Sequence, residues 1–573
     1  MGFNEAKSAF VPEDATKFES FEPAIQAYNQ DVVNQMEKFD PEFYAKCVAE
    51  IPTAEILDSQ PINAISFLSL LSPQEQTIVA EFTIEDLTQK QLSGELTAVA
   101  IAKAFIKASI VAQLTTNCVM QFMIPEALQR AQELDDYLQA NHKLVGPFHG
   151  VVVSLKEHMN VKDKITCASY VAYLTNIPTN EAVSITILYK MGAVFHARTA
   201  QPQGIMHLDT WNNISGRTRN PRSTRLSPGG SSGGESAMVA MRGSVIGVGS
   251  DIGGSIRAPA AFTDIFGIRP TTRRISLMNG LSSGKGQESI VAVQGPLARS
   301  IDELDTYMRV YINEGKPWLY DPLCVPLQWR EPKLPKKIRI GVLYDDNLVT
   351  PFPAITRGMK STVAKLSETA EFEFVNLNPK WFSEKEMVDI YTTNLRLYTC
   401  DGNKVQLEMW GPSGEPLLPL TKHYMKFGGG KELSIYDNKM LNAQRDALKV
   451  EMLQKYFSDV DFILSPTYNG PAEMPAESLY WGYTSFWNLL DYPNVVFPVN
   501  VAHDVKKDAQ IPELKQNMYE KMVWYKENGD IRYDPESYIG GPVALQLTGN
   551  RFCDEDVVAL TKKFVTTLGI ERR

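Results

Sequence analysis

The sequence predicts an α/β fold in which helices flank a mixed central β-sheet. Short runs of buriable, β-branched residues alternate with amphipathic helical patterns along most of the chain, and this alternation is typical of such sheets. The chain has 573 residues, of which 44% are hydrophobic and 22% charged, an ordinary composition for a globular protein. We expect one large domain over residues 81–573, preceded by a helical extension over residues 1–80 that packs on it.

The elements can be assigned in order from their periodicity. In the extension, Phe18, Phe21, Ile25 and Tyr28 recur at three- and four-residue spacing, which indicates an amphipathic helix. Later helices are predicted over 98–112, 125–140, 183–191 and 554–568, from residue 301 onward, and within 350–366. Buried strands are predicted over 148–155, 193–197, 337–343, 374–375, 461–464, 494–499 and 543–547.

Charge and cysteine usage narrow the class of protein. The net charge of −10 disfavours binding to nucleic acid or to an anionic membrane surface. The six cysteines form no C-x-x-C pair, which argues against zinc-ribbon and thioredoxin-like sites and favours free thiols in a reducing compartment. The apolar tract Val99–Ala112 is short and contains Lys103 and Lys107, so it is not predicted to span a bilayer. We expect a cytoplasmic protein with a small-molecule substrate and no nucleic-acid or membrane partner, which could form a homodimer.

Two glycine- and serine-rich clusters dominate residues 227–271. The segment Gly229–Gly234 is G-G-S-S-G-G and Gly253–Ser255 is G-G-S, with apolar residues between and after them. Glycine lets other groups approach the main chain closely, so the clusters predict a site made of hydroxyls and exposed backbone N–H groups. A flexible linker would have polar flanks, and a phosphate-binding loop would continue into Gly-Lys-Ser/Thr. Neither pattern is present.

The two clusters leave more than one nucleophile open. A G-x-S-x-G pattern centred on Ser231 or Ser232 is compatible with the nucleophile elbow of an α/β-hydrolase. That elbow needs a buried strand before it, whereas Pro228 stands there, which argues against a strand. Ser255 is the third candidate. None of the seven histidines lies in a recognisable triad setting, and we expect each to be structural.

Lys156 ends a buried apolar run and is the candidate base. Lysine is rarely buried, and burial lowers the pKa of an amine because the charged form loses hydration. A lysine that is neutral near physiological pH can accept a proton. The alternative is a structural lysine that reaches solvent or pairs with a carboxylate.

Together these segments resemble the amidase signature family of serine hydrolases, from about residue 82 to the end of the chain. The resemblance rests on residues 228–271 and on 146–157, G-P-F-H-G-V-V-V-S-L-K-E, with further agreement over 295–300, 461–467 and 541–547. The runs 340–346 and 490–499 are most similar to the fungal acetamidase or general amidase branch. One departure is Arg198-Thr199-Ala200, where many members have Lys-Thr-Asn.

The resemblance implies a Ser–cis-Ser–Lys triad and no metal or cofactor. Lys156 takes the role of base, Ser231 the bridging role after a cis peptide bond, and Ser255 the role of nucleophile. The backbone N–H groups of the run from Ile252 through Gly253 and Gly254 to Ser255 would form the oxyanion hole. The remaining nearby residues are assigned to support: Ser232 to hydrogen bonding within the loop and substrate site, and Asp251 with Arg257 to bracing.

The implied activity is hydrolysis of small carboxylic amides, with aryl amides and carbamate esters such as urethane left open. Longer acyl amides, as cleaved by fatty acid amide hydrolases, are an alternative, disfavoured because no N-terminal membrane helix is predicted. An ammonia-supplying amidotransferase subunit and a non-catalytic scaffold are weaker alternatives, and the scaffold is disfavoured because Lys156, Ser231 and Ser255 are all present. Tyr170, Met206 and Trp211 are candidate pocket walls.

Overall fold

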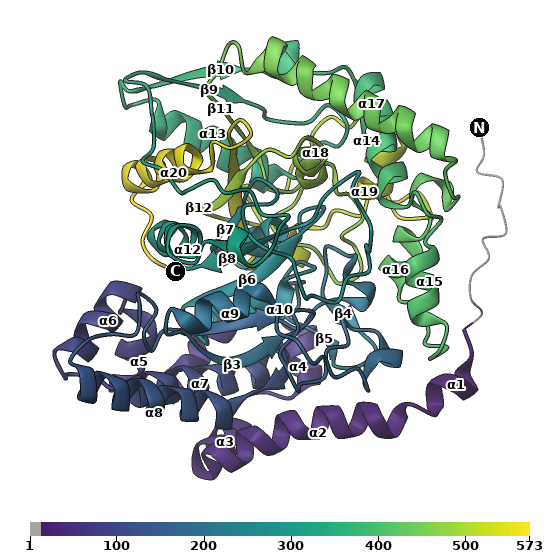
Figure 1. The fold of residues 1–573 in the computed structure, drawn as a ribbon. Helices are drawn as coiled ribbons and strands as arrows, with labels where there is room; N and C mark the ends of the chain where they lie inside the picture. The colour runs from purple at the N-terminus through teal and green to yellow at the C-terminus, as the bar shows by residue number, and fades with distance from the viewer. Residues whose placement is uncertain (1–12) are drawn as a thin grey trace.

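A computed structural model describes residues 13–573 (Figure 1). Within these residues eleven strands form one sheet, in the order β1-β3-β2-β6-β8-β7-β12-β13-β11-β9-β10. The strands are β1 (Val119–Phe122), β2 (Val152–Lys156), β3 (Val194–Thr199), β6 (Ile246–Asp251), β7 (Phe266–Arg269), β8 (Val293–Ala298), β9 (Ile338–Val342), β10 (Phe372–Asn376), β11 (Phe462–Pro466), β12 (Asn494–Ala502) and β13 (Pro542–Thr548). A separate two-stranded ribbon pairs β4 (Trp211–Asn212) with β5 (Gly216–Arg217).

The large sheet is mixed, as predicted. Strand β2 runs parallel to β3 and β6, and β9 runs parallel to β10 and β11. Between these parallel groups, β6, β8, β7, β12, β13 and β11 pair antiparallel in turn. The carboxyl ends of β2 and β6 therefore meet at one edge of the sheet, which is where parallel sheets place their sites.

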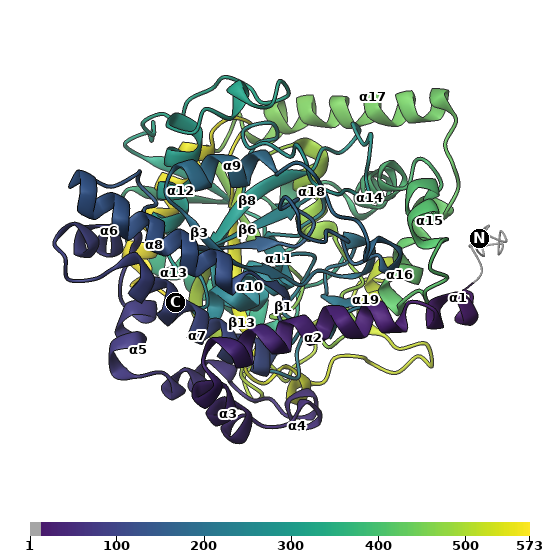
Figure 2. The same ribbon diagram turned by 60° about the horizontal axis from the view of Figure 1, so that its bottom comes forward.

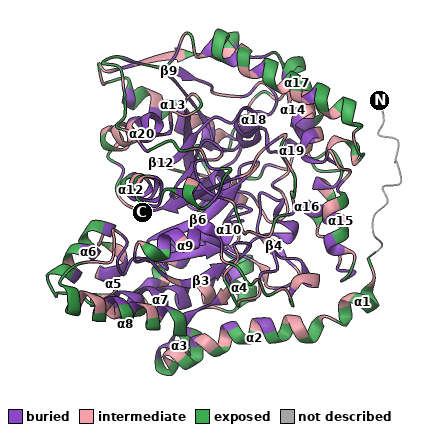
Figure 3. Cartoon of the chain, in the orientation of Figure 1, coloured by how far each residue is buried: buried purple, intermediate pink, exposed green. Residues whose placement is uncertain are grey.

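Helices cover both faces of the sheet (Figures 1 and 2). The main helices of the chain are α6 (Ile84–Leu92), α7 (Ala98–Thr116), α8 (Ile124–Asn141), α9 (Val183–Lys190), α10 (Gly233–Ala240), α11 (Arg257–Phe262), α12 (Ile301–Asn313), α13 (Pro353–Leu366), α14 (Glu384–Tyr398), α15 (Lys404–Trp410), α16 (Pro419–Tyr424), α17 (Ile435–Glu451), α18 (Gly482–Leu490), α19 (Met518–Trp524) and α20 (Asp554–Leu568). One hydrophobic cluster joins the sheet to α7, α12, α13 and α20. A second, rich in aromatic residues, lies beneath α14, α17, α18 and α19. Figure 3 shows the strands buried between these layers.

The segment 13–80 is helical and runs along the outside of α7 and β1. It contains α1 (Ala15–Glu19), α2 (Glu22–Phe39), α3 (Pro41–Glu50), α4 (Ala54–Ser59) and α5 (Pro73–Ala80). Val32 and Met36 of α2 and Cys47 of α3 belong to the same hydrophobic cluster as α7. The apolar face predicted from Phe18 to Tyr28 packs on Met120 and Cys167.

Helix α7 is longer than predicted. It continues to Thr116 and so is long and apolar enough, by length and composition, to cross a membrane. Two thirds of its apolar window are buried within the structure, where Ile101, Phe105 and Ile110 are fully enclosed. This burial is the pattern of a core helix.

Most predicted elements are confirmed, and six strands were missed. Helix α20 has the predicted bounds, and β3, β9, β11, β12 and β13 lie within two or three residues of theirs. The strand predicted over 148–155 begins only at Val152, because residues 146–150 form a turn with Gly150 at φ +72°. The missed strands are β1, β4, β5, β6, β7 and β8, of which β6 and β7 lie in the apolar stretches between and after the two glycine- and serine-rich clusters.

Candidate active site

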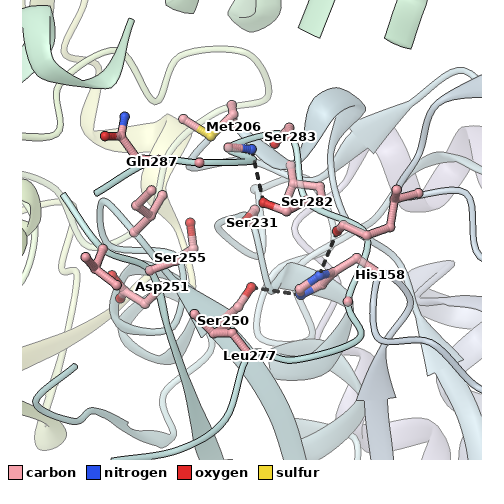
Figure 4. A pocket seen from close by; sticks show the side chains of 18 of the residues that line it. His158, Met206, Ser231, Ser250, Asp251, Ser255, Leu277, Ser282, Ser283 and Gln287 are labelled. Carbon is pink, nitrogen blue, oxygen red and sulfur yellow. Dashed lines mark hydrogen bonds between the residues drawn. The ribbon is translucent and has the colours of Figure 1, made fainter. Parts of the chain in front are cut away.

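The candidate site lies where β2 and β6 end side by side. Leu155 of β2 pairs with Val248 of β6, so Lys156 and the residues after Val248 reach the same edge of the sheet. The loop after β6 carries Ser255 into α11, and the G-G-S-S-G-G loop carries Ser231 into α10. Figure 4 shows Ser231, Ser250 and Ser255 around one cavity. The structure thus brings the three predicted triad residues together from three elements.

Lys156 is fully buried and hydrogen-bonded to hydroxyls. Its Nζ lies 2.7 Å from Ser231 Oγ and 3.1 Å from Ser250 Oγ. Burial lowers the pKa of Lys156 to about 7, although the negative charges of Asp251 and Glu235 oppose this shift. The amine is therefore available in its neutral form near neutral pH.

Ser231 follows a cis peptide bond from Gly230, the geometry that the resemblance implies. A side chain at residue 230 would have its Cβ 2.2 Å from the carbonyl oxygen of Asp209, so only glycine fits there. Ser231 is 1% exposed and lines the cavity. The tight contact at residue 230 restricts the backbone before Ser231, whose hydroxyl oxygen accepts from Lys156 Nζ at 2.7 Å.

Ser232 ties the two loops together. Its backbone N–H donates to the carbonyl of Ser255 at 3.0 Å, and its hydroxyl donates to the carbonyl of Ser250 at 3.2 Å. It is fully buried and is not among the residues that line the cavity. The segment before it, around Pro228, is not a strand, so the chain lacks the strand that a nucleophile elbow requires.

Ser255 faces the cavity from a loop that Asp251 braces. Its hydroxyl has no hydrogen-bond partner among residues 13–573, and the residue is 6% exposed. The Asp251 carboxylate accepts from the N–H of Gly254 at 2.9 Å and of Ile256 at 3.1 Å, and pairs with Arg257 Nε at 3.1 Å. Burial alone would raise the pKa of Asp251, but the guanidinium holds it well below its ordinary value.

The prediction that the Gly254 N–H donates to an oxyanion is corrected, because this N–H already donates a hydrogen bond to the Asp251 carboxylate. The N–H groups of Ile252, Gly253 and Ser255 donate to no group within the described part of the chain. Gly254 has φ +128°, and a Cβ there would meet Thr484 at 2.3 Å. The second glycine is therefore required by backbone conformation and packing.

Two residues at the site were not predicted from the sequence, Ser250 and His158. Both line the cavity. His158 Nε2 lies 3.0 Å from Ser250 Oγ, and His158 Nδ1 lies 3.2 Å from the carbonyl oxygen of Leu281 (Figure 4). Burial and the nearby charge of Lys156 lower the pKa of His158 to about 3. The sequence contained one indication that His158 lies at the site, because this residue stands two positions after the candidate base.

The cavity has a volume of about 230 Å³ and mostly apolar walls. Its walls include Met206, as predicted, together with Ile275, Leu277 and Tyr398. Two predicted wall residues were wrong: Tyr170 packs against Trp410, with ring centroids 5.4 Å apart, and Trp211 lies in the β4–β5 ribbon. Among residues 13–573 no group of three or more His, Cys, Asp or Glu side chains is placed to hold a metal ion.

Comparisons with known proteins identify the family of the chain. The Amidase family model matches residues 100–558. The chain is 36% identical over 510 residues to an acetamidase of Emericella nidulans, covering 86% of this chain and 90% of that one. It is also 36% identical over 520 residues to an acetamidase of Aspergillus oryzae, covering 87% and 92%. A solved structure of a fatty acid amide hydrolase superposes with a TM-score of 0.91 at 41% identity, covering 98% of both chains. The chain belongs to the amidase family, the hydrolases that act on amide carbon–nitrogen bonds.

Proposed function

We propose that the chain hydrolyses amides of small carboxylic acids through an acyl-enzyme on Ser255, with Ser231 and Lys156 as the proton relay. The observation that carries this proposal is the 2.7 Å hydrogen bond between the buried Lys156 Nζ and Ser231 Oγ, in a cavity that Ser255 also lines. With a pKa of about 7, an appreciable fraction of Lys156 is neutral at neutral pH. A buried neutral amine next to a hydroxyl is a competent base.

The relay first moves a proton from Ser255 toward Lys156 and then returns a proton to the leaving nitrogen. Neutral Lys156 takes the proton of Ser231, and Ser231 takes that of Ser255, whose oxygen attacks the amide carbonyl carbon. Run in reverse, the relay gives this proton to the amide nitrogen, the C–N bond breaks, and the acyl group stays on Ser255. Water then attacks the ester with the same base, which releases the acid and restores the serine.

The tetrahedral oxyanion would be held by backbone donors after β6. The N–H groups of Ile252, Gly253 and Ser255 are the candidates, because that of Gly254 is bound to Asp251. Loss of one such donor costs about 3–4 kcal/mol of transition-state stabilisation. The Asp251 brace holds these donors in place before substrate arrives, which is the preorganisation that this kind of catalysis needs.

The substrate range is proposed from the relatives and the cavity. The fungal relatives named acetamidases support small acyl groups, and aryl amides and urethane present the same carbonyl chemistry. Longer acyl amides are the second candidate. They are favoured by the apolar walls of a cavity of about 230 Å³, which exceeds what acetamide fills, and by the similarity to the fatty acid amide hydrolase structure.

A serine-directed fluorophosphonate tests the nucleophile. Intact-mass and peptide analysis should find one adduct, on Ser255, in the wild-type chain, and none in Ser255→Ala. The matched control is Ser283→Ala, which removes another cavity-lining hydroxyl and should leave labelling intact. An adduct on Ser232 would overturn the proposed roles in favour of the elbow mechanism.

A panel of acetamide, an aryl amide, a long-chain acyl amide and ethyl carbamate separates the substrate classes. We expect kcat/KM to be highest for the short amides. A kcat/KM that rises steadily with acyl length would replace this proposal by the second candidate. The triad itself would be unaffected by that outcome, because the labelling experiment does not depend on the acyl group.

A further inference from the structure

Lys156 donates to a second hydroxyl that the proton relay does not use. Ser250 Oγ lies 3.1 Å from Lys156 Nζ, in addition to the 2.7 Å contact between Lys156 and Ser231. Ser250 Oγ also lies 3.0 Å from His158 Nε2. A neutral amine has two protons and one lone pair, and a base works only when the lone pair faces the proton it takes. Which way the Ser250 hydroxyl points therefore decides which way the lysine lone pair points.

The tautomer of His158 fixes that direction. A carbonyl oxygen only accepts, so the contact with the Leu281 carbonyl at 3.2 Å requires a proton on Nδ1. Burial, with the charges of Lys156 and Arg198, keeps the imidazole neutral and its pKa at about 3, so Nε2 carries a lone pair. Nε2 must then accept the Ser250 proton, and the Ser250 oxygen is left to accept a proton from Lys156.

The backbone around His158 holds the ring in this state. The carbonyl of His158 accepts from the Leu281 N–H at 2.9 Å, and Met159 forms a bridge with Gly280. His158 is thus pinned by its main chain and its side chain to the same residue, Leu281. His158 is 7% exposed and lines the cavity (Figure 4), as does Leu281.

We propose that His158 is a positioning residue for the base, which acts through Ser250 to keep the lone pair of neutral Lys156 directed at Ser231. This inference rests on the proposed function, since it assigns a direction to the proton relay. It makes Ser250 an obligatory acceptor toward Lys156. Without His158, the Ser250 hydroxyl can turn and donate to the lysine lone pair, which takes that lone pair away from Ser231.

The test measures the second-order rate constant for fluorophosphonate modification of Ser255 as a function of pH. For His158→Phe we expect a plateau rate about 10- to 100-fold below wild type, the usual cost of a misdirected catalytic group. The acid limb of this pH profile should also move to lower pH by up to about one unit. The reason is that a hydrogen bond from the Ser250 hydroxyl to the amine stabilises the neutral form and so lowers the pKa of Lys156. The titratable groups that act on the pKa of Lys156, the carboxyl groups of Asp251 and Glu235, are unchanged in this variant.

Three further variants separate positioning from a structural role. His158→Gln keeps an acceptor for the Ser250 hydroxyl and should recover most of the rate. Ser250→Ala removes the acceptor that fixes the direction of the amine, so its plateau rate should also fall, and the double variant should be no slower than the slower single one. The matched control is His196→Phe, which also removes a buried histidine bonded to a serine hydroxyl, 2.7 Å from Ser109, but does not line the cavity. Its acid limb should not move.

The outcomes distinguish this inference from the proposed function. No labelling of the wild-type chain would overturn the proposed function and with it this inference. Normal wild-type labelling with an unchanged plateau in His158→Phe would overturn the inference alone. Equal losses of plateau rate in His158→Phe and His158→Gln with an unmoved acid limb would also overturn it. That result is expected if His158 contributes only packing.

Discussion

Two cations are buried at the same edge of the sheet in opposite environments. Arg257 is fully enclosed and paired with Asp251 at 3.1 Å, and it also donates to Asn488 and Asn494. Lys156 is equally enclosed, but within residues 13–573 no carboxylate lies within ion-pair distance of it, and its contacts are hydroxyls. The paired cation braces a loop, whereas burial without a carboxylate partner lowers the pKa of Lys156 to about 7 and makes its neutral form available for proton transfer. This difference in environment indicates that Lys156, and not Arg257, is the group that transfers protons.

Replacement of Lys156 should have the largest effect on activity. Lys156→Met removes the base and fills its space with an apolar chain, so we expect kcat to fall by about 10³- to 10⁵-fold. Wild-type activity should fall about tenfold per pH unit below pH 7, as the amine becomes protonated, and the residual activity of the variant should lack this limb. A pH–rate profile with amide substrate measures both.

The stability of the same variant sharpens the comparison. The folded pKa of Lys156 lies below its ordinary value, so the unfolded chain binds more protons between about pH 7 and pH 10. The contribution of Lys156 to the wild-type free energy of unfolding should therefore increase as the pH rises through that range. Lys156→Met lacks this pH-dependent contribution, and its free energy of unfolding at pH 7 should be no lower than that of wild type. A variant that unfolds at much lower denaturant at pH 7 would contradict the view of Lys156 as an uncompensated charge.

The contrast also explains what could be predicted from the sequence. Lys156, Ser231 and Ser255 stand in long local motifs, so their roles could be assigned by resemblance without coordinates. His158 and Ser250 meet only because β2 and β6 are adjacent, and that pairing joins segments about 90 residues apart. The commitment of the Gly254 N–H to Asp251 depends on loop geometry, which residue types alone do not give.

The missed strands have a similar cause. Strand β6 contains Gly247 and Gly249, and β8 contains Gly295 and Pro296, residues that local propensity assigns to turns. The glycines are needed because neighbouring layers approach closely. A Cβ at Gly249 would lie 2.8 Å from Leu297 and 2.9 Å from Ser232. Tertiary packing thus overrides the local preference next to the site.

The compensated pair of Asp251 and Arg257 can be broken by a single substitution. Asp251→Asn keeps the shape of the side chain but leaves Arg257 charged, enclosed and without its partner carboxylate. Removal of one member of a buried pair typically costs about 3–5 kcal/mol, and we expect a loss of this size in chemical unfolding. Activity should also fall, because Gly254 and Ile256 lose a charged acceptor and the oxyanion donors are less well held. The double variant Asp251→Asn, Arg257→Met should regain part of the stability, and a single variant as stable as wild type would show that the pair does not brace the loop.

The smallest effect is expected at Glu235, a buried carboxyl near the base. Its oxygens accept from Ser154 Oγ at 2.6 Å and Thr199 Oγ1 at 2.5 Å. Burial raises its pKa to about 8, although hydrogen bonds from these hydroxyls and the charge of Lys156 oppose the rise. Because the carboxyl is then largely protonated at pH 7, Glu235→Gln replaces a neutral acid with a neutral amide of nearly the same shape. We expect kcat at pH 7 within about threefold of wild type. Glu235→Ala should unfold at lower denaturant, because it leaves a cavity and removes the acceptor that both hydroxyls share. A loss of activity in Glu235→Gln comparable to that of Lys156→Met would mean that the ionised carboxylate acts on the base, and that Lys156 is compensated after all.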